Sequence, residues 1–205
     1  MNWRNIPMPP LIAARPRDAR GYPILFTSYI DDAGVPDFRI SDPAKRDQCF
    51  QERRCGICGN VMGDLMVMVF LGGPLAVANR CFGDPPMHPP CAEYSRLVCP
   101  WLSLNRDRHV PMGSEVHGGR VRNPPGGVEN KTNLMALYST HGYIGCRGDT
   151  SGYVFYADLP IRVVWYEQAT GARAQPKPEP RPRRELPPRE LRLMPAWKQI
   201  KGATS

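Results

Sequence analysis

The sequence predicts a small α+β domain whose core needs a cross-link. Hydrophobic residues make up 41% of the 205 residues, and the chain contains 24 Pro and 19 Gly. This composition is typical of a fold rich in loops and hairpins, with fewer apolar side chains than an average globular domain. Within residues 55–100, two pairs of cysteine and histidine residues bracket the most apolar runs of the chain.

Composition divides the chain into three parts. Residues 1–20 contain four Pro and four Arg with little apolar periodicity, which predicts an extended arm. Residues 21–170 are predicted to form the folded domain. Residues 171–205 hold nine Lys or Arg, three Glu and seven Pro, so they are expected to form an extended, mostly disordered tail. The tail therefore carries most of the net charge of +8, because the rest of the chain has 18 basic and 16 acidic side chains.

Export and membrane signals are missing from the sequence, which predicts a cytoplasmic protein. The first residues lack the uninterrupted apolar core of a secretory signal. The longest apolar stretch, residues 65–78, is interrupted by Gly72, Gly73 and Pro74, so it is too short to cross a bilayer. In a reducing compartment, the seven cysteines are expected to be metal ligands and buried thiols rather than disulfides.

A hairpin and a helix are predicted before the first cysteine pair. Residues 23–30 are rich in β-branched and aromatic side chains, and residues 35–40 alternate as a returning strand after a turn at 31–34. A polar capping residue then precedes Pro43, as is typical of a helix start. The helix is expected over residues 43–54 and on the surface, because its apolar content is low.

Cys55 and Cys58 have the C-x2-C spacing at which two thiolates reach one metal ion. Such a pair can bind one ion only if the chain turns tightly, and Gly56 and Gly59 provide the backbone freedom for that turn. The motif therefore predicts a zinc knuckle.

A second hairpin and a second helix are predicted after the knuckle. Residues 65–71 are expected to form a strand, 72–74 a turn and 75–78 the returning strand. Pro89 suits the first turn of a helix that Pro100 ends. One face of this helix is expected to carry Cys91, Tyr94, Ser95 and Val98, with Glu93 and Arg96 away from it.

His88 and Cys91 repeat the two-residue spacing of the knuckle at the start of this helix. This order of elements is that of a treble-clef zinc finger: a knuckle, then a hairpin, then a helix that carries the second ligand pair. In addition, the positive end of the helix dipole favours a thiolate at the helix N-terminus. The predicted zinc ligands are Cys55, Cys58, His88 and Cys91. Cys81 competes with His88 for the fourth position. The remaining cysteines are expected to be buried thiols: Cys49, Cys99 and Cys146.

Residues 103–130 form a long segment with little apolar content, and a loop of that length is usually functional or disordered. One hypothesis is a second metal or catalytic cluster of Asp107, His109, Glu115 and His117. The other is a solvated loop, because nothing in the sequence fixes those side chains relative to one another. Arginines of this loop and of the tail are candidates for contacts with nucleic-acid phosphates: Arg106, Arg108, Arg120, Arg122, Arg181, Arg183 and Arg184.

Three more strands are predicted after this loop, over residues 134–138, 153–156 and 161–166. Residues 139–148 are punctuated by glycine but lack the flanking strand and helix of a phosphate-binding loop. An apolar cluster near the end of the tail is expected to dock on a partner or on the domain: Leu191, Leu193, Met194 and Trp197.

Short motifs are spread over about residues 20–170: Gly21-Tyr-Pro, Pro36-Asp-Phe-Arg, Cys55-Gly-Ile-Cys58-Gly, Gly73-Pro74, Asn79-Arg80, Pro85-Pro-Met-His88-Pro-Pro-Cys91-Ala-Glu-Tyr and Cys99-Pro-Trp-Leu102. In these motifs the chain resembles a family of small uncharacterised proteins of bacteriophages and bacterial genomes. The resemblance supports the four ligands named above and implies a phage or prophage origin. It implies no activity, and it does not extend into the tail.

Three functions follow as hypotheses. The first is a non-enzymatic, zinc-stabilised module that binds nucleic acid through its tail and arginine-bearing loop. The second is a protein-interaction or virion component whose two proline-rich ends thread onto neighbours. The third is a metal-dependent nuclease with His109, His117 or His141 as base. A nucleobase deaminase is not supported, because its H-x-E and P-C-x-x-C motifs are incomplete here.

Overall fold

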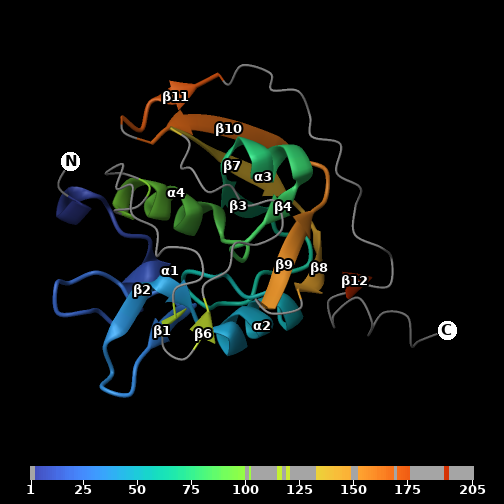
Figure 1. Ribbon diagram of the computed structural model, residues 1–205. Coiled ribbons are helices and arrows are strands. Elements are labelled where there is room, and N and C mark those ends of the chain that lie inside the picture. The colour runs from blue at the N-terminus through green and yellow to red at the C-terminus, as the bar shows by residue number, and fades with distance from the viewer. Residues whose placement is uncertain are drawn as a thin grey trace.

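Two four-stranded antiparallel sheets and several short helices make up the fold, seen in a computed structural model (Figure 1). The structure describes residues 3–99, 102, 115–116, 119–120, 133–148, 152–168, 170–175 and 192–193. No helix in these parts of the chain combines the length and the apolar character that a membrane crossing requires. The predicted mixture of helices and small sheets is confirmed.

The strands of the two large sheets are interleaved along the chain. In the first sheet the order is β11 (Arg173–Ala174), β10 (Arg162–Glu167), β7 (Leu134–Thr140) and β3 (Met68–Gly72). In the second it is β12 (Arg192–Leu193), β8 (Tyr143–Gly148), β9 (Gly152–Ala157) and β4 (Cys81–Phe82). The chain crosses from one sheet to the other between β3 and β4, between β7 and β8, and between β9 and β10 (Figure 1). The three strands predicted after residue 130 are confirmed as β7, β9 and β10.

Aromatic side chains from both sheets form the centre of the core. Phe70 of β3 stacks on Phe82 of β4 with 4.8 Å between ring centroids. Tyr143 of β8 meets Phe70 edge to face at 6.0 Å and Phe155 of β9 at 5.5 Å. Each of these rings is almost completely buried. The cluster joins the two sheets because its rings come from strands of both. Each such ring pair adds about 0.5–1.5 kcal/mol of stability beyond that of the buried area.

The first predicted hairpin is confirmed with a shorter first strand. β1 (Ser28–Ile30) pairs with β2 (Pro36–Ser41) around the predicted turn. The residues before β1 do not continue this strand, because their backbone groups bond elsewhere: the Ile24 N–H donates to the Pro16 carbonyl and the Phe26 N–H to the Ile57 carbonyl. These bonds connect the hairpin to the N-terminal segment and to the cysteine knuckle.

The first predicted helix is α2 (Pro43–Gln51), which ends three residues earlier than expected. Its start is confirmed: the Asp42 carboxylate accepts the N–H groups of Ala44 and Lys45. Arg53 has a φ of 53°, a left-handed conformation that no helix continues through. The helix also buries Phe50 against the aromatic core, so it is more than a surface element.

The prediction of a returning strand over residues 75–78 is wrong. These residues belong to helix α3 (Pro74–Asn79), which begins with a proline in its first turn and ends before Arg80 in the left-handed region. A short run of alanine and other apolar residues does not distinguish strand from helix by pattern. Here β3 pairs with β7 and β4 pairs with β9, so the knuckle is not followed by a hairpin of these two segments.

The N-terminal segment is packed against the domain, in contrast to the extended arm that its composition predicts. It forms a 3-10 turn, η1 (Trp3–Asn5), and a helical turn, α1 (Pro10–Ala13). Ile12 is fully buried, and the Trp3 ring stacks on Tyr22 at 4.1 Å. A few apolar residues therefore anchor this segment, although they are too few to form a helical or strand pattern in the sequence.

The predicted boundary at residue 171 also differs from the structure, because β11 pairs with β10. Farther along the tail, β12 pairs with β8 through Arg192 and Leu193 and forms the edge strand of the second sheet (Figure 1). Within the long 103–130 segment, β5 (Glu115–Val116) and β6 (Gly119–Arg120) pair as an antiparallel hairpin whose strands have two residues each.

The second predicted helix is confirmed as α4 (Pro89–Val98), although one of its side chains is placed differently. Arg96 was expected to point away from the packed face but is only 8% exposed. Its guanidinium lies 3.9 Å from the centroid of the Tyr166 ring and donates a 3.4 Å hydrogen bond to the Gly171 carbonyl. It also pairs with Glu93. Arg96 thus connects α4 to β10 and to the start of the tail.

Replacing Arg96 with Ala is expected to lower the free energy of unfolding by about 2 kcal/mol, since cation–π stacking, stem packing and a hydrogen bond are lost together. Arg96→Lys is expected to recover only part, because an ammonium lacks the planar stacking surface. Urea denaturation measures both. The control is Glu93→Gln, whose 43% exposed side chain should contribute little. A wild-type midpoint for Arg96→Ala would contradict the assigned role.

Candidate metal centre

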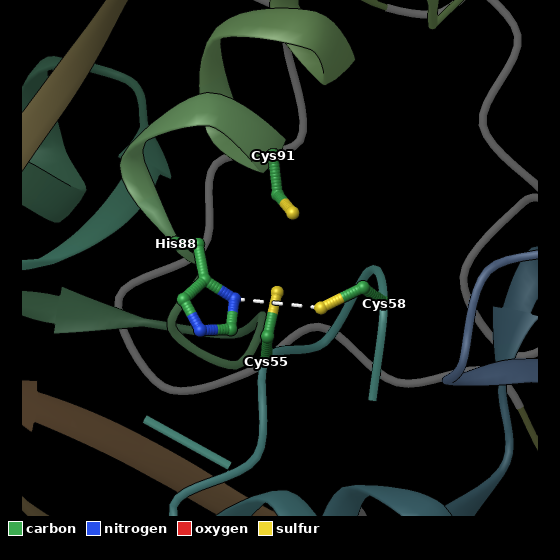
Figure 2. Close-up of side chains that lie close together, drawn as sticks. All are labelled: Cys55, Cys58, His88 and Cys91. Carbon is green, nitrogen blue, oxygen red and sulfur yellow. Dashed lines mark hydrogen bonds between the residues drawn. The ribbon is translucent and has the colours of Figure 1, made fainter. Parts of the chain in front are cut away.

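Four side chains from two segments converge at the start of helix α4. They are Cys55, Cys58, His88 and Cys91, and their potential ligand atoms all lie within 4.8 Å of one another. All four residues are buried, and Figure 2 shows the side chains pointing toward a common centre. The His88 Nδ1 and the Cys58 Sγ are 3.4 Å apart. The predicted set is therefore brought together, and it could bind a metal ion.

The first ligand pair lies on a tight turn closed by backbone hydrogen bonds. The Gly59 N–H donates to the Cys55 carbonyl at 2.9 Å, and the Cys55 N–H donates to the Asn60 carbonyl at 2.9 Å. Gly59 has a φ of 80°, and a Cβ there would lie 2.6 Å from the Phe26 ring. Only glycine satisfies both the conformation and the space. Of the two glycines expected to shape the turn, Gly59 has the special backbone angle.

The second ligand pair is held against both the knuckle and the first sheet. Met87 and Val69 of β3 exchange two backbone hydrogen bonds of 2.8 and 2.9 Å. The Gly56 N–H donates to the Pro86 carbonyl at 3.0 Å. His88 is then the N-cap residue of α4, and Cys91 lies in the first turn with no exposed surface. The two pairs therefore face each other because β3 and the knuckle both hydrogen-bond to residues 86–87.

The side chains of the cluster shift one another's pKa values, in opposite directions for different residues. Burial opposes ionisation of Cys55, but hydrogen bonds from Cys58, Cys91 and His88 outweigh it and hold the pKa of Cys55 far below its usual value. The hydrogen bond with Cys55 raises the pKa of Cys91 well above the usual range. Hydrogen bonds with Cys55 and Cys58 raise the pKa of His88 to about 10. The cluster therefore favours a negatively charged sulfur beside a positively charged group. A bound metal cation could provide that positive charge.

The other cysteines are placed outside this cluster. Cys81, the alternative fourth ligand, lies on β4 opposite Tyr156 and is not among the four clustered residues. Cys49 is fully buried, and burial raises the pKa of its thiol far above the usual value, as expected of an inert thiol. Cys99 is half-buried rather than buried. The side chain of Cys146 lies outside the described residues.

Most of the other predicted site residues also lie outside the described residues. This applies to the side chains of the candidate second cluster, except Glu115, which is exposed, and to the arginines proposed for phosphate contacts. The outside residues are Arg106, Asp107, Arg108, His109, His117, Arg122, Arg181, Arg183 and Arg184, together with the side chain of Arg120. His141 is exposed on the turn between β7 and β8, beside a cavity of about 390 Å³ that Arg80 and Asp158 also line.

Arg53 is a supporting residue that the sequence does not reveal. Its side chain is only 2% exposed, and it donates a 3.2 Å hydrogen bond to the His141 carbonyl. One guanidinium nitrogen lies 3.5 Å from the Asp64 carboxylate. Its carbonyl accepts the Met62 N–H at 2.9 Å, so Arg53 directs the chain from α2 into the knuckle. Arginine is seldom buried, and no local pattern marks this one.

Comparison of the chain with protein-family models, with curated proteins and with solved structures finds no match.

Proposed function

We propose that the cluster is a structural zinc site that stabilises a non-enzymatic binding module. Three thiolates and one imidazole are a common ligand set for structural zinc, with ligand distances of about 2.3 Å for sulfur and 2.0–2.1 Å for nitrogen. A tetrahedron of that size has edges of about 3.4–3.8 Å. The ligand atoms of the four residues lie within 4.8 Å of one another, so small side-chain movements would complete it.

A treble-clef-like arrangement is the local form that we propose for this site. The knuckle contributes Cys55 and Cys58, and the first turn of α4 with its N-cap contributes Cys91 and His88. Strand β3, helix α3 and strand β4 occupy the interval where a simple treble clef has a hairpin. The ligand-bearing ends of the motif are thus supported, with a longer connection between them.

The closed ligand set is the observation that carries the non-enzymatic assignment. Catalytic zinc sites keep one position open for water or substrate, whereas four protein ligands leave none. All four residues are at most 5% exposed, so substrate would have no path to the ion without rearrangement. The metal would therefore contribute stability rather than Lewis-acid chemistry.

Nucleic acid is the partner that we propose, bound mainly through the tail. Beyond Gln175 the sequence contains eight basic residues and three Glu. The N-terminal segment adds four arginines and one aspartate over residues 3–20. Contacts of such side chains with phosphates give affinity with strong salt dependence and little sequence preference.

The affinity for a labelled duplex is expected to fall about 100-fold between 50 and 200 mM salt if about four phosphates are neutralised. A variant that ends at Gln175 retains β11 and should lose most of this binding. A full-length variant with the eight distal basic residues changed to Gln tests charge at constant length. Fluorescence anisotropy measures all three proteins. Affinity that is insensitive to salt, or unchanged in both variants, would overturn the proposal.

Size-exclusion chromatography of the same proteins tests the alternative of a virion or protein-interaction component. That alternative predicts self-assembly that persists without nucleic acid and depends on the chain ends. The packed N-terminal segment offers no free arm over residues 3–20, which favours the nucleic-acid proposal.

A further inference from the structure

Arg15 is a half-buried cation beside the cysteine knuckle. It follows helix α1 in the N-terminal segment, and its Nε donates a 2.9 Å hydrogen bond to the Ile24 carbonyl. No carboxylate in the described parts of the chain forms an ion pair with its guanidinium. Because removing a charge from water is costly, a group in this position is expected to have an opposite charge nearby.

Phe26 connects Arg15 to the knuckle. The Phe26 N–H donates to the Ile57 carbonyl at 2.8 Å, so this part of the chain lies along the loop between the two knuckle cysteines. The Phe26 ring packs against Gly59, where an added Cβ would approach it to 2.6 Å. The Arg15 guanidinium lies 5.9 Å from the centroid of the same ring. The guanidinium is therefore held on the side of the knuckle that Phe26 covers.

The charge that Arg15 faces is that of a knuckle cysteine. Burial lowers the pKa of Arg15, and an electrostatic interaction with Cys58 opposes that change. A second arginine, Arg54, also contacts the knuckle, since it donates to the Gly59 carbonyl at 2.9 Å. Its charge, however, is already paired with Glu52 at 2.7 Å. Of these two arginines, Arg15 is the one whose charge no described carboxylate neutralises.

A metal centre made of these ligands would carry a negative charge that needs compensation. A zinc ion brings two positive charges, and the thiolates of Cys55, Cys58 and Cys91 bring three negative ones, so a neutral His88 leaves an excess of one negative charge. Water solvates this excess poorly, because all four residues are at most 5% exposed. A cation held beside the cluster would therefore stabilise the metal-bound form.

We propose that Arg15 balances the charge of the metal centre and thereby increases its affinity for zinc. This inference rests on the proposed structural zinc site and adds a residue outside the ligand set. Arg15 acts through the thiolates and does not touch the ion. The N-terminal segment, which the fully buried Ile12 anchors, thus has a role in metal retention because it brings Arg15 to the knuckle.

Competition for zinc between the full-length protein and a chromophoric chelator tests the proposal. Arg15→Gln is expected to weaken zinc binding about 10-fold, the lower end of the effect of residues that support metal ligands. Arg15→Lys is expected to keep most of the affinity, because the positive charge is retained. Arg39→Gln is the charge-matched control, since this exposed arginine is paired with Asp37, and it should bind zinc like the wild type.

Cobalt substitution separates the effect of charge from damage to the site. The visible absorption bands of bound cobalt report ligand type and geometry, and they should be the same in the wild type and in Arg15→Gln. Equal zinc affinity of these two proteins, an equal loss in Arg15→Lys and Arg15→Gln, or altered cobalt bands in Arg15→Gln would overturn the proposal. A wild-type protein that binds no zinc would instead refute the zinc site itself, so the two failures are distinguishable.

Discussion

Replacing Cys91 with Ser is expected to abolish both tight zinc binding and the cooperative unfolding transition. Structural zinc contributes about 10–16 kcal/mol in small zinc-binding peptides, as much as the whole stability of a typical domain. Cys91 is fully buried at the first turn of α4. A zinc ion bound there would connect this helix to the two cysteines of the knuckle. Cys55→Ser should have the same effect. Metal content per chain and a thermal melt measure the two losses.

Two other cysteines provide matched controls. Cys81→Ser changes a half-buried cysteine outside the cluster and should retain one zinc per chain. Cys49→Ala removes a fully buried thiol and should cost about 1–2 kcal/mol without loss of metal. Retention of zinc and of a normal melt in Cys91→Ser, or loss of zinc in Cys81→Ser, would contradict the proposed ligand set.

Metal retention is also expected to depend on pH, because protons compete with the ion for the three thiolates. Binding should therefore weaken as the pH falls, and a chelator should remove zinc faster in acid than at neutral pH. Release of zinc should coincide with loss of the cooperative melt. A chelator-treated protein that melts like the zinc-loaded protein would exclude a structural role for the metal.

Replacing Gly145 with Ala is expected to destabilise the protein by about 3 kcal/mol, although a single methyl group is added. A Cβ at Gly145 would lie 2.1 Å from the Phe50 ring. That ring cannot simply move aside, since it also packs near Tyr143 and Phe155 of the aromatic core. Chemical denaturation measures the loss.

A rescue variant makes this prediction specific. Phe50→Leu in the Gly145→Ala background should recover part of the loss, giving a positive coupling energy in a double-mutant cycle. Gly63→Ala is the control, because its added Cβ would meet only Met66, at 3.7 Å. Equal stability of Gly145→Ala and Gly63→Ala would show that α2 does not pack on β8 as described.

The metal cluster could be predicted because its information is local. Cys55 and Cys58 are close in the chain, as are His88 and Cys91, and each spacing directs two donors to one ion whatever the remaining fold. The same is true of the Asp42 cap of α2 and of the proline start of α4, where one or two adjacent residues determine a helix terminus.

Segments whose state depends on distant partners could not be predicted in this way. Residues 75–78 have an apolar pattern compatible with strand or helix, and they form a helix where β3 and β4 each pair with a different strand. Residues 143–148 belong to a stretch punctuated by glycine, for which the sequence analysis predicts no strand. They form β8, where Gly145 leaves room for the Phe50 ring.

The sequence by itself determined the four residues of the cysteine and histidine cluster, the main helix starts and the excess of basic charge in the tail, since these depend on spacing and composition. Only the tertiary structure decided how strands are shared between two sheets, why Arg96 is buried, and how Arg15 comes to lie beside the cysteine knuckle. Those features arise from contacts between residues far apart in the chain. Burial and pairing at such positions depend on which surfaces meet, and a local pattern does not specify that.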